Sequence, residues 1–269
     1  VPGMLEKLIA EGVDVVRLNL SHGQPDDHRA RAQAVRAAAE AAGREVGILA
    51  DLQGPKIRIE TFADGPVELV EGAEFVLDCR PDVPPGDASR VGVSYYDLPG
   101  DVHAGDVLLL DDGLVALTVH EVVGSEVRCS VLVGGKLSNR KGLNRQGGGL
   151  SVTALSDKDK ADIKLAAEIG ADFLAVSFVR SADDMHLARR LLEEAGGSAA
   201  LVSKIERADA IPVLGEIIDA SDVVMVARGD LGVEIGDAER PGLQKKIIRE
   251  TVQRNRAVIT ATQMLQSMV

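Results

Sequence analysis

Charged and hydroxyl side chains follow nearly every short apolar run of this sequence, where they could bind or convert a ligand. They are Arg17, Asn19, Ser21, His22, Asp51, Ser177, Arg180, Lys204, Glu206, Arg228, Asp230, Thr260 and Thr262. In parallel α/β proteins, binding and catalytic groups lie at the carboxyl ends of the strands. Polar residues also mark the places where ordinary strands leave a core. The whole set nevertheless favours a site, because buried charges are costly unless they pair or bind something.

Two acids and several bases of this set suit a magnesium-dependent phosphoryl transfer. Glu206 and Asp230 follow neighbouring apolar runs, and Mg²⁺ is commonly held by one or two carboxylates together with substrate oxygens and water. Arg17, Lys204 and Arg58 supply positive charge for phosphate oxygens. Residues two apart on a strand share a face, so Lys204 and Glu206 are expected to point together. Phosphoryl transfer depends mainly on such positioning and charge neutralisation.

Composition limits the class of protein. The 269 residues carry a net charge of −12, and 45% of them are hydrophobic but only 2% aromatic. An acidic chain is not expected to bind nucleic acid or an anionic membrane, because both favour basic surfaces. The sequence shows no apolar run near the length of a membrane span, and two cysteines, Cys79 and Cys129, form no disulfide framework. We therefore expect a cytoplasmic protein with two buried thiols.

Six apolar runs without polar alternation predict parallel strands that are covered on both faces. They occupy residues 13–18, 46–50, 173–178, 199–203, 223–227 and 257–260. Helical patterns lie between them, and two of these open with capping boxes at Ser156 and Ser181. The alternating charges of 157–164 predict a solvated helix face. Repeated strand–helix units predict an α/β fold, either an open doubly wound sheet or an incomplete (β/α)8 TIM-type barrel.

A long interval between the second and third runs predicts an inserted domain. The two runs start 127 residues apart, roughly 95 more than a strand–helix unit of ~30 residues requires. Short alternating runs and turn signals such as 111–113 fill this interval, which predicts a small antiparallel β-barrel domain. We place it at residues 56–149, with 147–149 as its return hinge. Residues 1–55 and 150–269 then form the two parts of the main domain.

Several stretches of the sequence together resemble the pyruvate kinase family. They are "VVRLNLSHG" (15–23), "ADLQGPKIR" (50–58), "LLLDDG" (108–113), "VSKIERAD" (202–209), "SDVVMVARGDLGVEI" (221–235) and "ITATQMLQSM" (259–268). They occur in the order of the family and cover essentially the whole chain. The resemblance implies a TIM-type barrel with an inserted β-barrel lid, which transfers the phosphoryl group of phosphoenolpyruvate to ADP and gives pyruvate and ATP.

The resemblance also implies roles for individual substrate-binding and catalytic residues. Lys204 would stabilise the transferring phosphoryl group and the developing enolate. Arg17 would hold the transferred phosphate, and Thr262 would lie near the carbon that is reprotonated. The backbone N–H groups of Gly229 and Asp230 would receive the carboxylate of the substrate.

Metal and nucleotide ligands follow from the same resemblance. Glu206 and Asp230 would bind Mg²⁺ or Mn²⁺ between the phosphate and enolate oxygens. The nucleotide would be contacted by Asn19, His22, Arg58 and Lys141. Of these, Lys141 would arrive from the inserted domain as it closes over the site, excluding water and thereby strengthening charge interactions.

Lys56 bears on whether the protein needs potassium. Many family members hold K⁺ with residues that match Asn19, Ser21, Asp51 and the backbone carbonyl of Leu52. Those members usually carry Glu at the position of Lys56, and this chain resembles the members that work without a monovalent cation. The ammonium of Lys56 would replace the charge of K⁺ beside Asp51, so we expect turnover without K⁺.

The short length of this chain leaves alternatives to an active pyruvate kinase open. Family members are considerably longer, so the sequence resembles a fragment without the first and last barrel strands and the C-terminal domain. We expect residues 1–269 alone to be poorly stable and poorly active, because unpaired strand edges invite aggregation; a full-length form is expected to be a homotetramer. A magnesium-dependent aldolase or lyase of a 2-oxo acid would use a similar carboxylate pair. An inactive truncated form or scaffold is the remaining alternative.

Overall fold

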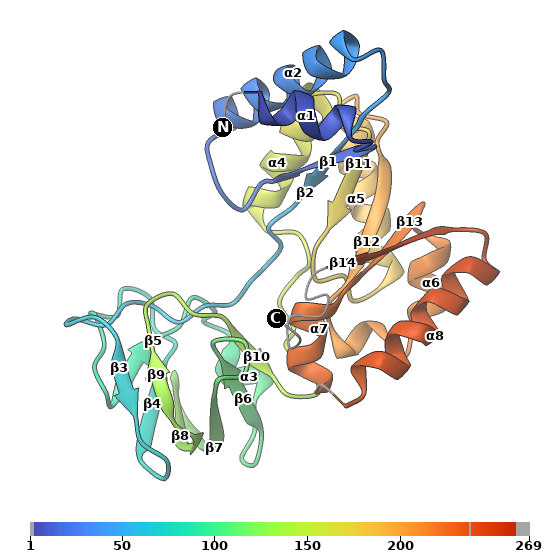
Figure 1. Ribbon diagram of the computed structural model, residues 1–269. Helices are drawn as coiled ribbons and strands as arrows, with labels where there is room; N and C mark the ends of the chain where they lie inside the picture. The colour runs from blue at the N-terminus through green and yellow to red at the C-terminus, as the bar shows by residue number, and fades with distance from the viewer. Residues whose placement is uncertain (1–2, 237, 262–269) are drawn as a thin grey trace.

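The computed structural model describes residues 3–236 and 238–261, and the larger of its two units is built on a six-stranded parallel sheet (Figure 1). Its strands, in sheet order, are β1 (Val15–Asn19), β2 (Gly47–Asp51), β11 (Phe173–Val176), β12 (Ala200–Ile205), β13 (Val223–Ala227) and β14 (Ala257–Ala261). All six predicted runs contribute to these strands. A doubly wound sheet reverses its strand order at a switch point. The described strands follow the chain order without reversal, so they do not support that alternative.

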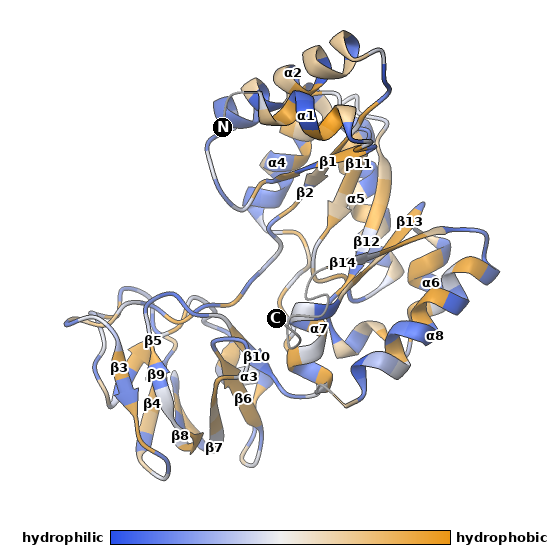
Figure 2. Ribbon diagram, in the orientation of Figure 1, coloured by the Kyte–Doolittle hydropathy of each residue, from blue (hydrophilic) through white to orange (hydrophobic). Residues whose placement is uncertain are grey.

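Helices and a short 3₁₀ turn precede or connect the parallel strands. They are α1 (Met4–Ala10), α2 (Pro25–Ala41), α4 (Asp157–Glu168), α5 (Ala182–Glu194), η1 (Ala208–Ala210), α6 (Leu214–Asp219), α7 (Arg228–Ile235) and α8 (Arg240–Gln253). α4 and α5 begin with capping boxes at Ser156 and Ser181, as predicted. Figure 2 shows apolar residues on these helices and along the sheet, where their side chains form a core of Leu, Ile, Val, Ala and Met. No helix in residues 3–236 and 238–261 has the length and apolar character needed to span a bilayer.

The predicted solvated face of 157–164 is wrong in part. Asp159 is fully buried at the start of α4. Its Oδ2 accepts a hydrogen bond from the backbone N–H of Ser156 at 2.9 Å, and its Oδ1 accepts one from the backbone N–H of Gly54 at 3.0 Å. The capping carboxylate therefore has a second partner in the loop after β2, and α4 anchors that loop. A sequence of alternating charges does not reveal that a cap faces inward.

A second unit, mostly antiparallel, lies between β2 and α4 in the chain. Its elements are β3 (Val67–Leu69), β4 (Glu74–Asp78), β5 (Arg90–Gly92), α3 (Leu98–Asp101), β6 (Val107–Leu110), β7 (Val115–Val123), β8 (Glu126–Val133), β9 (Gly135–Leu137) and β10 (Leu143–Arg145). One sheet has the order β10-β6-β7-β8-β4-β5, and β3 pairs with β9. β4 and β5 run parallel, which the prediction of an antiparallel domain missed.

The second unit has a hydrophobic core of its own. Phe75, Leu77 and Leu117 are fully buried in it. Cys79 and Cys129 lie in the same core as free thiols, as predicted. Burial raises the pKa of each thiol to about 12, so both stay protonated at neutral pH and act as small apolar side chains.

Two chain segments join the units, and glycine is required in both. Gly54 on the outgoing segment has a φ of +68°, and a Cβ there would lie 2.7 Å from the ring of Phe178. Gly148 on the returning segment has a φ of +80°, and its Cβ would lie 2.6 Å from Oδ1 of Asp209. The next residue, Gly149, donates its backbone N–H to the same carboxylate oxygen at 3.0 Å. Both segments thus pass close to residues that follow β11 and β12.

Candidate active site

Arg17, Asp51, Lys204 and Glu206 meet near the carboxyl ends of β1, β2 and β12. Arg17 Nε lies 2.6 Å from Oδ2 of Asp51. Lys204 Nζ lies 3.2 Å from Oδ1 of Asp51 and 3.0 Å from Oε1 of Glu206. The prediction that Lys204 and Glu206 point together is confirmed by this contact. One ammonium therefore joins two buried carboxylates that come from different strands.

The Glu206 carboxylate has an unusual environment. It is buried, and its Oε2 accepts the backbone N–H of Phe178 at 2.8 Å. Phe178 adopts a φ of 57°, a conformation that is rare for a bulky residue and recurs at functional sites. Burial raises the pKa of Glu206 to about 7; the positive charge of Lys204 opposes this rise, whereas the negative charge of Asp230 adds to it. Glu206 and Asp230 are therefore close enough to influence each other.

Lys204 keeps its proton despite being buried. Burial lowers its pKa, but the charges of Glu206 and Asp51 outweigh that effect, and the net pKa is raised. Lys204 Nζ also donates to Oγ of Ser177 at 2.7 Å, and Ser177 donates onward to the carbonyl oxygen of Leu52 at 2.8 Å. The site thus contains a fixed ammonium in a poorly solvated position, where a charge interacts strongly with an anion.

Lys56 does not pair with Asp51, which corrects the expectation placed on it. Its Nζ lies 3.1 Å from Oδ1 of Asp230, a residue of the first turn of α7. The ion pairs of Asp51 are formed with Arg17 and Lys204. Lys56 follows the turn at residues 54–55 in the segment that leads from β2 to the second unit, and its side chain there reaches Asp230 of α7.

The remaining residues predicted at the end of β1 make local contacts. Oδ1 of Asn19 accepts the backbone N–H of Ser21 at 3.1 Å. The backbone N–H of His22 donates to the carbonyl oxygen of Asn19 at 3.5 Å, and its side chain is exposed. Lys158 of α4 donates to the carbonyl oxygen of Leu20 at 2.7 Å and so fixes this loop. Arg17, Asn19 and Ser21 were predicted to point together, but only Arg17 pairs with Asp51.

The predicted nucleotide ligands of the second unit pair within that unit. Arg58 Nη1 donates to the carbonyl oxygen of Arg140 at 2.9 Å, and Lys141 Nζ lies 2.8 Å from Oδ1 of Asp111. Gly142 forms an isolated bridge with Arg58, so the outgoing and returning segments lie side by side here. The two basic residues therefore belong to one local structure at the base of the second unit.

Gly229 and Thr262 are the remaining residues that were predicted to contact the substrate. Gly229 is in the first turn of α7 beside Asp230, where backbone N–H groups are free of intrahelical partners and can receive an anion. Thr262 lies outside the described residues.

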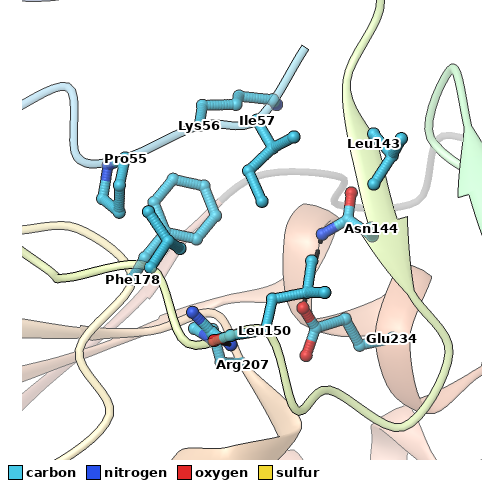
Figure 3. A pocket seen from close by; sticks show the side chains of 10 residues that line it. Pro55, Lys56, Ile57, Leu143, Asn144, Leu150, Phe178, Arg207 and Glu234 are labelled. Carbon is cyan, nitrogen blue, oxygen red and sulfur yellow. Dashed lines mark hydrogen bonds between the residues drawn. The ribbon is translucent and has the colours of Figure 1, made fainter. Parts of the chain in front are cut away.

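A small cavity separates the second unit from the ends of the parallel strands (Figure 3). Glu234 of α7 closes one side of it: this carboxylate accepts the backbone N–H of Ala208 at 2.8 Å and the amide of Asn144 at 3.4 Å. Burial raises the pKa of Glu234. Arg207 also lines the cavity and donates to the carbonyl oxygen of Leu150 at 2.7 Å (Figure 3). The cavity measures ≈ 20 Å³, space for about one water molecule, so the units are in close contact at this point.

Comparisons with known proteins identify the family. Residues 2–269 match the model of the pyruvate kinase barrel domain. The chain belongs to the pyruvate kinase family. It is 58% identical to pyruvate kinase II of Salmonella typhimurium and 56% identical to a pyruvate kinase of Haemophilus influenzae, in each case over 98% of this chain and 56% of the relative. A crystal structure of a pyruvate kinase from Cryptosporidium parvum matches with a TM-score of 0.92 at 34% identity, over 98% of this chain and 55% of that chain. The chain thus spans about half the length of these relatives.

In this pyruvate kinase family chain, the donor set near α7 fits a hard dication such as Mg²⁺. Two carboxylates, Glu206 and Asp230, contribute to it: burial is the main cause of the raised pKa of Glu206, and the negative charge of Asp230 adds to the rise. Among the described residues, no group of three or more His, Cys, Asp or Glu is arranged to hold a metal by itself. Carboxylate oxygens are ligands that Mg²⁺ takes in proteins, where water and phosphate oxygens complete the shell of one or two carboxylates.

Sequence reasoning missed the residues that support this site in the pyruvate kinase chain. Ser177 was noted as a strand end but given no role, although it connects Lys204 to the carbonyl oxygen of Leu52. Arg207, Glu234 and Asp209 hold the returning segment through Leu150, Asn144 and Gly149. Charged residues just after an apolar strand were the available signal for Arg207 and Asp209. Glu234 lies inside a helix and had no comparable signal.

Proposed function

We propose that this protein is a pyruvate kinase, which transfers the phosphoryl group of phosphoenolpyruvate to ADP. The observation that supports it best is the Lys204 ammonium held between Asp51 and Glu206, with Asp230 nearby. An anion that carries both a phosphate and a carboxylate needs such a cluster of mixed charge, with a dication to complete it. The family membership supports the same reaction.

In the proposed reaction, the bond between phosphorus and the enol oxygen of phosphoenolpyruvate breaks as a β-phosphate oxygen of ADP bonds to phosphorus. Lys204 and Arg17 neutralise the oxygens of the transferring group. Lys204 also stabilises the enolate, which becomes pyruvate when its terminal carbon takes up a proton close to Thr262. Glu206 and Asp230 would hold Mg²⁺ or Mn²⁺, which supplies additional charge neutralisation for these oxygens.

Substrate and nucleotide binding would involve both units. The backbone N–H groups of Gly229 and Asp230 receive the carboxylate of phosphoenolpyruvate in this proposal. The nucleotide is held by Asn19, His22, Arg58 and Lys141. We propose that residues 56–149 act as a lid domain on a (β/α)8 TIM-type barrel, to which 1–55 and 150–269 contribute. The strand order without reversal and the high TM-score support a barrel.

Pyruvate formation tests the proposal directly. The protein should form pyruvate from phosphoenolpyruvate only when both ADP and Mg²⁺ are present, in a coupled assay that oxidises NADH. A magnesium-dependent lyase or aldolase would not require ADP. Pyruvate release without ADP would therefore contradict the proposal and favour a lyase or aldolase.

We also propose that turnover does not require K⁺. Lys56 places a positive charge beside Asp230, so the support for this proposal is the sequence resemblance. Family members that hold K⁺ with positions matching Asn19, Ser21, Asp51 and the Leu52 carbonyl usually carry Glu where this chain has Lys56. Rates should be similar in buffers with and without K⁺, with tetramethylammonium as the balancing cation. A large activation by K⁺ would show that the cation site is still used.

A homotetrameric, cytoplasmic enzyme is the final element of the proposal. The family resemblance supports the tetramer of a full-length form, and the two buried free thiols suit a reducing cytoplasm. Light scattering on the purified protein tests the tetramer, and fractionation of cells tests the location.

A further inference from the structure

Lys56 stands at the base of the second unit, and its ammonium faces the parallel sheet unit. Its Nζ lies 3.1 Å from Oδ1 of Asp230, and each of the two side chains is about one quarter exposed, at 26% and 25%. They are 174 residues apart in the chain. This contact joins the segment that leads into the second unit to the helix that carries a predicted metal ligand.

The position of Lys56 is fixed by its neighbours. Its backbone N–H donates to the carbonyl oxygen of Gly54 at 3.0 Å. Its side chain passes over Gly142 of the returning segment, where an added Cβ would lie 3.2 Å from Cε of Lys56. The side chain therefore runs between two chain segments, and it has less freedom than a lysine on an open surface. Because the side chain is already restricted, forming the ion pair with Asp230 costs less side-chain entropy.

The charges of the site balance when Lys56 is included. Its acids are Asp51, Glu206 and Asp230, and the bases paired with them are Arg17, Lys204 and Lys56. When all three acids are ionised, three negative and three positive formal charges give a group without net charge. A dication that approaches such a group alone gains little attraction, and at Asp230 it competes with an ammonium that is already in place.

We propose that Lys56 is an internal counter-ion of Asp230, which makes binding of the divalent cation depend on an anionic, phosphate-bearing substrate. The substrate brings the negative charge that the dication needs, and its phosphate offers Lys56 an alternative partner. Metal and substrate then bind together much more tightly than either binds alone. This inference rests on the proposed function and adds to it a residue that controls metal affinity.

Binding of Mn²⁺ without turnover tests the inference. Free Mn²⁺ is measured by electron paramagnetic resonance during titration of the full chain, first alone and then with phosphoenolpyruvate, always without ADP. Lys56→Gln and Lys56→Met should bind Mn²⁺ alone about tenfold more tightly, because one positive charge near the ligand is removed. The increase in Mn²⁺ affinity caused by phosphoenolpyruvate should fall by about the same factor in both variants.

Two controls separate charge from other effects. Lys56→Arg keeps the charge and should bind Mn²⁺ alone as weakly as the unaltered protein. Lys160→Gln removes the same charge from an exposed ion pair with Asp157 on α4 and should change neither affinity. Circular dichroism verifies that all variants are folded.

The outcomes distinguish this inference from the proposed function. If Mn²⁺ binds to the Lys56 variants no more tightly than to the Lys160→Gln protein, the counter-ion inference is overturned while the proposed metal site stands. If Mn²⁺ binds to none of the proteins even with phosphoenolpyruvate, the proposed metal site and the inference both fail.

Discussion

The two units of the molecule use charged residues in opposite ways. In the antiparallel unit, the buried carboxylate of Asp78 is paired with Arg80 and Arg90, whose side chains are largely solvated. In the parallel unit, buried Lys204 lies between two buried acids. Solvated partners leave an acid stably ionised at little cost, whereas a wholly buried charge cluster costs desolvation free energy. The difference is consistent with charges that stabilise the antiparallel unit and with the proposed ligand site in the parallel unit.

Among the substitutions considered, replacement of Lys204 should cause the largest loss of stability and of turnover. Lys204→Met leaves Asp51 and Glu206 buried without their shared cation, which should lower the free energy of unfolding by about 3–5 kcal/mol. Turnover of phosphoenolpyruvate should fall by about 10³-fold, because the charge on the transferring group is no longer neutralised. Denaturant unfolding and steady-state kinetics measure the two effects.

Lys160→Met is the matched control, since it removes an exposed lysine of the same length. Its ion pair with Asp157 is solvated, so stability should change by less than about 0.5 kcal/mol. Unchanged stability of Lys204→Met would show that the two acids do not depend on this cation.

Substitution of Gly54, in the segment that joins the two units, should lower the unfolding free energy by an intermediate amount. Gly54→Ala forces alanine into a φ of +68° and places its Cβ 2.7 Å from Phe178 and 2.8 Å from Cβ of Ser177. We expect a loss of about 2–4 kcal/mol in unfolding free energy from strain and overpacking. Because Ser177 and Phe178 contact Lys204 and Glu206, kcat should fall as well.

Gly65→Ala isolates the backbone contribution. Gly65 has a φ of +87° and no atom within 4 Å of an added Cβ, so only the conformational cost of about 1 kcal/mol remains. Equal losses in the two variants would mean that the close approach at Gly54 is unimportant. Thermal unfolding and kinetic assays of both proteins decide this.

The smallest expected effect concerns Asp78. Hydrogen bonds from Arg80, followed by those from Arg90, lower the pKa of Asp78 to about 2, whereas an unfolded aspartate has a pKa of about 3.9. A lowered pKa contributes stability above the unfolded value and loses it as the pH falls toward about 2. Asp78→Asn should cost about 1 kcal/mol at pH 7, a modest amount because water screens the arginines.

The pH dependence of the unfolding free energy tests the prediction on Asp78. The difference in unfolding free energy between Asp78→Asn and the unaltered protein should be constant from pH 5 to 7 and shrink below pH 4. A difference that persists unchanged at pH 2.5 would show that the ion pairs do not stabilise this unit. Urea titrations at a series of pH values measure it.

The strands and part of the site could be predicted from the sequence because they depend on local patterns. Continuous apolar runs specify buried parallel strands, and the alternation of side chains on β12 placed Lys204 beside Glu206. The contact of Lys56 with Asp230 could not be predicted in the same way. It depends on the direction in which the outgoing segment leaves the sheet, and that direction is set by close packing of Gly54 against Phe178.

The inward role of Asp159 shows a second limit of sequence reasoning. The capping box at Ser156 was predicted, since its residue types and spacing are sufficient to form it. That the carboxylate would also accept the N–H of Gly54 depends on a loop 105 residues earlier. Long-range pairing of polar groups is decided by tertiary packing, and the polar character of a residue alone does not specify it.

The attachment of the second unit by two adjacent segments restricts its motion. Arg58 and Gly142 bridge the outgoing and returning segments, and each segment passes through a glycine of positive φ, Gly54 and Gly148. A body held at two nearby points can rotate about the line through them but cannot drift away or spin freely. If residues 56–149 act as the proposed lid, Arg58 and Lys141 would therefore move together, because the bridged pair of segments holds both of them.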